Sequence, residues 1–136
     1  MVLEHIDNPK GLIAGVKRIL KAKGILFIEV PNMDSLMLKA AVLYFRLRGR
    51  DWSPLLSPLH YPFHCYGYNI SSLRRLLAMR GFTIKRVVIR DSSLRGFRSD
   101  TGGRTLEKLG RNVAARLCGF LGRGDVLMAV AQKEAV

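Results

Sequence analysis

The stretch Gly24-Ile25-Leu26-Phe27-Ile28-Glu29-Val30-Pro31-Asn32 decides the fold class of this chain. Its run from Ile25 to Val30 is almost continuously apolar, which is the pattern of a strand buried on both faces. Pro31 and Asn32 stop that strand, and Gly24 is expected to end the preceding helix in the left-handed conformation. A helix, a glycine and a buried strand form half of a βαβ unit, so the sequence predicts an α/β fold with a parallel sheet.

Helices and strands alternate on either side of this stretch. Asp7-Asn8-Pro9 offers a side-chain cap followed by proline at the first helical position. Asn69 offers a cap for another helix, which Gly81 is expected to close. Apolar spacing predicts four helices and two further strands, with the helices over residues 9–23, 33–48, 70–80 and 106–121 and the strands over 82–89 and 126–131. Such alternation is typical of a layered α/β domain.

Length and composition limit the classes of protein that fit. The 136 residues suit one domain, and 49% hydrophobic with 24% charged residues is typical of a globular protein. The net charge of +13 favours anionic partners. The two cysteines, Cys65 and Cys118, belong to no metal-binding or disulfide pattern, so we expect a reducing cytoplasm. The most apolar stretch, 36–45, is too short to span a bilayer.

Four segments together resemble a known family. They are Val2-Leu3-Glu4-His5-Ile6, then Leu20-Lys21 with the stretch from Gly24 to Asn32, then Pro62-Phe63-His64-Cys65-Tyr66-Gly67-Tyr68-Asn69, and finally Gly124 to Lys133. In this order and spacing they resemble the C-terminal half of a class I S-adenosylmethionine-dependent methyltransferase. The resemblance is closest to the group that includes ubiquinone-biosynthesis O-methyltransferases and the sugar or lipid methyltransferases of surface-polymer pathways.

The resemblance implies a truncated Rossmann-like methyltransferase fold in which the last strand is antiparallel to its neighbours. It implies a single partial domain over residues 1–136, with a lid or insertion over 33–68 and a basic loop and helix insertion over 92–124. The family holds its cofactor with a glycine-rich loop that follows its first strand, and no such loop precedes Val2. We therefore expect the first three strands to be missing, and the chain alone to bind S-adenosylmethionine weakly and to be inactive. A missing N-terminal half or a homo-oligomeric partner would complete it.

The same resemblance suggests residues for the cofactor and the acceptor. Leu3, Glu4 and His5 would line the cofactor, S-adenosylmethionine, in the complete protein; alternatively, Glu4 and His5 only support the start of the helix, where an acid suits the helix dipole. Asn32 ends a strand at the carboxyl edge of the sheet, where ligands bind in open α/β folds, so it is a candidate for substrate binding. Its alternative role is a turn residue.

His64 is the candidate catalytic residue. Methyl transfer to oxygen needs a base, and histidine titrates near neutral pH. The alternative is a hydrogen-bonded structural histidine in an aromatic loop. Tyr66 is a second candidate for substrate binding, although it also suits packing of the loop on the third helix. We predict no metal site, because His60 and His64 in a loop that contains proline make a weak ligand pair.

The implied function is methyl transfer from S-adenosylmethionine to a small-molecule or lipid- or glycan-type acceptor, with oxygen the favoured target. The alternative is a non-catalytic basic module that binds an anionic membrane surface or nucleic acid. No stacking platform or helix-turn-helix pattern indicates specific nucleic-acid recognition. The expected location is the cytoplasm, including the periphery of the inner membrane face.

Overall fold

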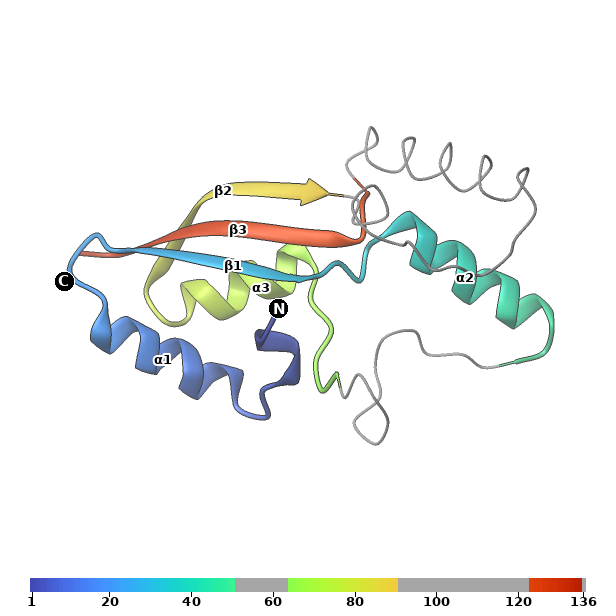
Figure 1. Ribbon diagram of the computed structural model, residues 1–136, viewed down its shortest axis with the longest axis horizontal. Coiled ribbons are helices and arrows are strands. Elements are labelled where there is room, and N and C mark those ends of the chain that lie inside the picture. The colour runs from blue at the N-terminus through green and yellow to red at the C-terminus, as the bar shows by residue number, and fades with distance from the viewer. Residues whose placement is uncertain (51–63, 91–122, 136) are drawn as a thin grey trace, which may run out of the picture.

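Three strands form one sheet in the order β1-β3-β2 (Figure 1), comprising β1 (Ile25–Pro31), β2 (Phe82–Arg90) and β3 (Val126–Lys133). The computed structural model describes residues 1–50, 64–90 and 123–135. The predicted helix over 106–121 and nearly all of the basic segment 92–124 lie outside the described residues, as do His60 and Cys118.

Both neighbouring pairs in the sheet are antiparallel. Ala129 in the middle of β3 lies opposite Ile28 of β1 on one side and Val87 of β2 on the other. The predicted antiparallel last strand is therefore confirmed. β1 and β2 run in the same direction, as a parallel sheet requires. They are not neighbours, however, because the antiparallel strand β3 lies between them.

Two helices cover one face of this sheet (Figure 1): α1 (Pro9–Ile19) and α3 (Ile70–Ala78). Both begin at the predicted caps. The Asn8 side chain accepts a hydrogen bond from the Gly11 N–H at 2.9 Å. Asn69 and Ser72 form a reciprocal capping box, in which each side chain bonds the backbone N–H of the other residue. A short 3-10 helix, η1 (Leu3–His5), precedes α1, and α2 (Leu36–Leu47) extends beyond the end of the sheet.

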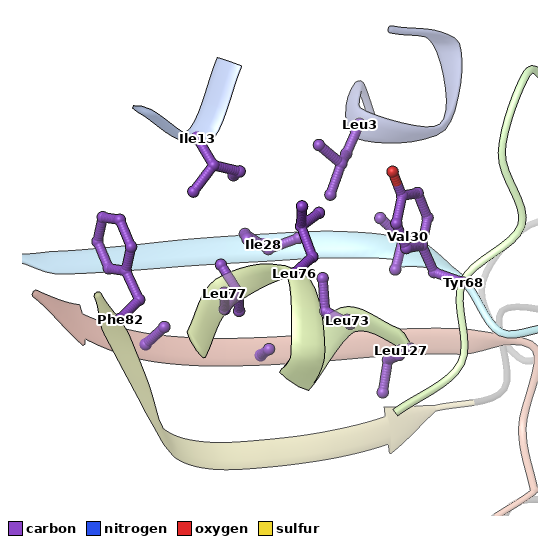
Figure 2. Packing of buried hydrophobic residues seen from close by; sticks show 12 residues of the cluster. Leu3, Ile13, Ile28, Val30, Tyr68, Leu73, Leu76, Leu77, Phe82 and Leu127 are labelled. Carbon is purple, nitrogen blue, oxygen red and sulfur yellow. The ribbon is translucent and has the colours of Figure 1, made fainter. Parts of the chain in front are cut away.

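The hydrophobic core lies between the sheet and these helices (Figure 2). One buried cluster joins three leucines of α3 to Leu127, Ala129 and Ala131 of β3, and α3 also lies against β2. The labelled core residues are Leu3, Ile13, Ile28, Val30, Tyr68, Leu73, Leu76, Leu77, Phe82 and Leu127. A helix stripe and a strand face that are far apart in sequence thus bury each other.

The prediction that residues 25–30 are buried on both faces is wrong for the described structure. Ile28 and Val30 are buried under the helices, but Ile25 and Phe27 on the opposite face are 53% and 57% exposed. No described element covers that face of β1. A continuous apolar run shows that a strand is suited to burial on both sides, but it does not supply the second covering layer.

The turn between α1 and β1 also differs from its prediction. Lys23, with φ of 60°, adopts the left-handed conformation in place of Gly24. Gly24 is needed for space instead, because a Cβ atom there would lie 2.9 Å from the carbonyl oxygen of Lys21. At the end of α3 the prediction is confirmed, since Gly81 has a φ of 72°.

Candidate functional site

The candidate site lies where η1 meets the segment 64–68, beside the carboxyl end of β1. Tyr68 forms an isolated parallel bridge with Asn32, the residue that follows β1. The Met33 N–H donates a hydrogen bond of 2.9 Å to the Tyr68 carbonyl. The segment that carries His64 is therefore attached to the end of the strand that the sequence placed at the ligand-binding edge.

Hydrogen bonds join this segment to η1. The Glu4 carbonyl accepts from the backbone N–H groups of Cys65 and Tyr66, at 2.8 and 3.2 Å. The Tyr66 hydroxyl donates to the Asp7 carbonyl at 3.1 Å, and the Cys65 thiol lies 3.4 Å from a carboxylate oxygen of Asp7. The hydrogen bond to Asp7 is the main reason that the pKa of the Cys65 thiol is raised. Two motifs about sixty residues apart thus form one unit.

Glu4, His5 and His64 form a compact cluster within this unit. Glu4 is only 1% exposed, and one of its carboxylate oxygens lies 3.6 Å from Nε2 of His5. The rings of His5 and His64 are 4.7 Å apart and tilted by 53°. The other Glu4 oxygen, Oε2, is buried and has no hydrogen-bond partner among the described residues. Such a buried acceptor is costly unless a donor or a cation reaches it.

The three proposed cofactor residues are consecutive in the sequence and form η1, but they differ in access. Leu3 belongs to the buried core and Glu4 is buried, whereas the His5 side chain is 38% exposed. One ligand atom from each of Glu4, His5 and His64 lies within 4.8 Å of the others. Two imidazoles and a carboxylate are a set that divalent metals accept, so the expected lack of a metal stays a prediction.

Asn32 is positioned by its own hydrogen bonds. Its amide nitrogen donates to the Gly124 carbonyl at 2.8 Å, and its amide oxygen accepts from the Asp34 N–H at 3.1 Å. Asn32 also lines a hollow of about 250 Å³ together with two cations, Lys39 and Arg123, and one acid, Asp34, which pairs with Lys39 at 2.9 Å. Sequence analysis does not single out these two cations as site residues. No sequence motif links them to Asn32, because the three residues come together only in the folded chain.

Tyr66 borders a second hollow, of about 360 Å³. This hollow also has Asp7, Pro9, Tyr68 and Leu76 in its lining. Burial, followed by the charges of Tyr66 and Glu4, raises the pKa of the Tyr68 phenol to about 12. Tyr68 is thus buried where the segment packs on α3, while Tyr66 stays half exposed at the rim.

Comparison with known proteins identifies the class. The sequence profile of the family described as "Methyltransferase domain" matches residues 1–87, and the chain belongs to that family. The structure is similar to the crystal structure of a SAM-dependent methyltransferase from Archaeoglobus fulgidus, with a TM-score of 0.53 and 18% sequence identity. A comparison with curated proteins finds none that matches.

The predicted Rossmann-like methyltransferase fold is thereby confirmed. The match covers 97% of this chain and 56% of the Archaeoglobus fulgidus chain, so this chain spans little more than half of that neighbour. The closer resemblance to ubiquinone-biosynthesis O-methyltransferases stays a prediction.

Proposed function

We propose that this chain contributes to the transfer of a methyl group from S-adenosylmethionine to a small-molecule or glycolipid-type acceptor, with oxygen as the target atom. The observation that carries the proposal is the union of residues 3–5 with residues 64–66 beside the carboxyl end of β1, in a member of the methyltransferase domain family. Ligands of open α/β sheets bind at that edge. S-adenosylmethionine, when bound, supplies a methyl group on a positively charged sulfur.

The cofactor contacts that we propose are made by Leu3, Glu4 and His5. The buried Oε2 of Glu4 has no donor among the described residues, which suits the ammonium group of the amino-acid end of the cofactor. This chain covers 56% of the Archaeoglobus fulgidus chain. We therefore propose that these residues form part of a binding site, which a further polypeptide segment or a partner chain completes.

The base that we propose is His64. An imidazole nitrogen of His64 would accept the proton of the acceptor hydroxyl as the oxygen takes the methyl group. The Glu4 carboxylate, which has an oxygen within 4.8 Å of an imidazole nitrogen of His64, would stabilise the positive charge that the imidazole gains. Tyr66 at the rim of the larger hollow and Asn32 beside Lys39 and Arg123 are the surfaces proposed for the acceptor.

Isothermal titration with S-adenosylmethionine and S-adenosylhomocysteine, at low and high salt, tests the cofactor half of the proposal. We compare this chain with a version extended by the residues encoded in frame upstream of Met1. The chain alone should not reach a submicromolar Kd, and the extended version should bind with little salt dependence. An extended version that carries a glycine-rich loop and still binds neither compound would contradict the proposal.

The base is tested in the extended version with His64→Gln. The loss of a general base should lower the methyl-transfer rate by about 100-fold or more. Because His64 is not a proposed cofactor contact, the Kd for S-adenosylhomocysteine should stay unchanged. Cys65→Ser, which changes the adjacent residue, is the control and should retain activity. Equal activity of His64→Gln and the control would remove His64 as the base.

The alternative, a non-catalytic basic module, predicts a different salt response. Binding of an anionic polymer or surface by a chain of charge +13 weakens steeply with ionic strength. Tight nucleic-acid binding with that steep dependence, and no cofactor binding by either version, would favour the alternative.

A further inference from the structure

Helix α2 exposes apolar side chains that the candidate site does not explain. It extends past the end of the sheet, away from α1 and α3 (Figure 1). Leu43 and Leu47 are 57% and 79% exposed, and Met37 and Tyr44 are about half exposed. Isolated exposed apolar residues are common, but a contiguous set of them marks an interaction surface.

The exposed apolar residues share one face of the helix. At about 100° per residue, Met37, Ala40, Leu43, Tyr44 and Leu47 fall within an arc of about 120°. Each of these five residues is exposed. Leu36 at the start of the helix falls within the same arc but is half-buried, as are the apolar residues outside the arc whose burial is described, Leu38, Val42 and Phe45. We call the five exposed residues the apolar arc.

Cations border the apolar arc on both sides. Lys39 and Arg46 lie about 40–60° beyond Leu43, and Arg48 lies about 20° beyond Met37. The Arg48 guanidinium also lies over the Tyr44 ring, 4.7 Å from its centre. Asp34 pairs with Lys39 at 2.9 Å, but no acidic residue occurs between positions 35 and 50, which include Arg50 as a fourth cation. Long basic side chains beside an apolar face can place their stems on it and their charges at its border.

We propose that α2 binds the surface of an anionic lipid bilayer, with the apolar arc among the acyl chains and the bordering cations at the headgroups. A helix with an apolar face flanked by Lys and Arg is suited to lie in the plane of the interface. Its 12 residues are about 18 Å long, too short to cross a hydrocarbon core of about 30 Å. No helix among the described residues could cross a membrane.

The positive charge beside the apolar arc favours an anionic bilayer over a second copy of this chain as the binding partner of α2. Two apolar arcs that pack together would bring their flanking cations together, and like charges at close range repel. Anionic headgroups instead attract each cation, and each basic residue near such a surface is expected to raise binding about fivefold. Apart from Lys39, which also lines the hollow beside Asn32, this surface is separate from the candidate site, so the inference does not depend on the proposed function.

Vesicle co-sedimentation of the full chain tests the apolar arc. The vesicles contain phosphatidylcholine alone or phosphatidylcholine with one quarter phosphatidylglycerol. We expect binding to the anionic vesicles only, and a loss of at least tenfold for the double variant Leu43→Glu, Leu47→Glu. Ile19→Glu is the matched control, since Ile19 on α1 is as exposed as Leu47. Equal binding by the double variant and the control would overturn the proposal.

A second pair of variants separates α2 from the overall positive charge. Arg46→Gln with Arg48→Gln should weaken binding to anionic vesicles about 25-fold. Lys10→Gln with Lys21→Gln removes the same charge from the α1 region and should leave binding nearly unchanged. Equal losses in the two double variants would show that only net charge acts. Sedimentation velocity tests whether the apolar arc instead binds a second copy of this chain. A dimer that Leu47→Glu dissociates would show that it does, and would overturn the bilayer proposal.

Discussion

Replacement of Asn32 by alanine separates its two predicted roles, acceptor contact and turn residue. The structure shows its side chain joining three segments: the end of β1, the backbone at Asp34, and the Gly124 carbonyl just before β3. The Asn32 side chain and Gly124 are buried. Asn32→Ala removes the donor of the Gly124 carbonyl and the acceptor of the Asp34 N–H. Neither group gains a new partner from a methyl side chain.

The expected cost follows from these two groups. A buried polar group left without a partner costs about 1–3 kcal/mol, and the Asp34 N–H is only partly buried. We therefore expect Asn32→Ala to lower the free energy of unfolding by about 2–4 kcal/mol. Urea unfolding followed by far-ultraviolet circular dichroism measures this change.

Asp34→Ala is the control for Asn32→Ala. Its carboxylate pairs with Lys39 at 2.9 Å, but both side chains are about half exposed. An exposed pair contributes no more than about 1 kcal/mol, so the control should unfold close to the parent chain. If Asn32→Ala also lies within about 0.5 kcal/mol of the parent, the reasoning from its hydrogen bonds is refuted. Acceptor binding would then be the better explanation of Asn32.

Three further predictions concern the core, a helix cap and a buried phenol. Leu77→Ala should cost about 2–5 kcal/mol in urea unfolding because Leu77 is fully buried, whereas Ile19→Ala at an exposed site should cost under 0.5 kcal/mol; equal costs would contradict the core assignment. Asn69→Ala breaks the capping box and should cost about 1 kcal/mol, while Asn69→Ser should recover most of it; if the serine variant is as unstable as the alanine variant, capping is not the reason. The pKa of Tyr68 is raised from 10.0 to about 12, so the unfolded phenol loses its proton first and stability should fall as pH rises from 10 to 12. Unfolding at several pH values should show a weaker fall for Tyr68→Phe, and an unchanged fall would exclude Tyr68 as its cause.

Local elements could be predicted from the sequence because their signals are local. Asn8 and Asn69 cap their helices through bonds to residues three positions away, and Gly81 ends α3 with a positive φ. The exception is the turn after α1, where Lys23 adopts the left-handed conformation and Gly24 avoids a clash. A glycine at such a turn serves either to adopt a positive φ or to avoid a steric clash, and the sequence alone does not distinguish these two reasons.

The residues of the candidate site come from a resemblance, because spacing alone does not single them out. Residues 3–5 and His64 were each singled out by the motifs that they belong to. Their meeting depends on the two hydrogen bonds from Cys65 and Tyr66 to the Glu4 carbonyl. The hollow that Asn32 shares with Lys39 and Arg123 had no sequence signal, because Asn32 and Arg123 lie 91 positions apart.

The sequence by itself determined the order of the described helices and strands and their bounds to within about four residues, the strongly positive charge, and the family to which the motifs belong. These properties depend on caps, apolar periodicity and residue types within a few positions of one another. Only the tertiary structure decided that β3 lies between β1 and β2, that one face of β1 is exposed at Ile25 and Phe27, and that Glu4 meets His64. The physical reason is that these outcomes depend on which distant segments pack against a given surface. The residues of that surface do not by themselves determine which segment packs there.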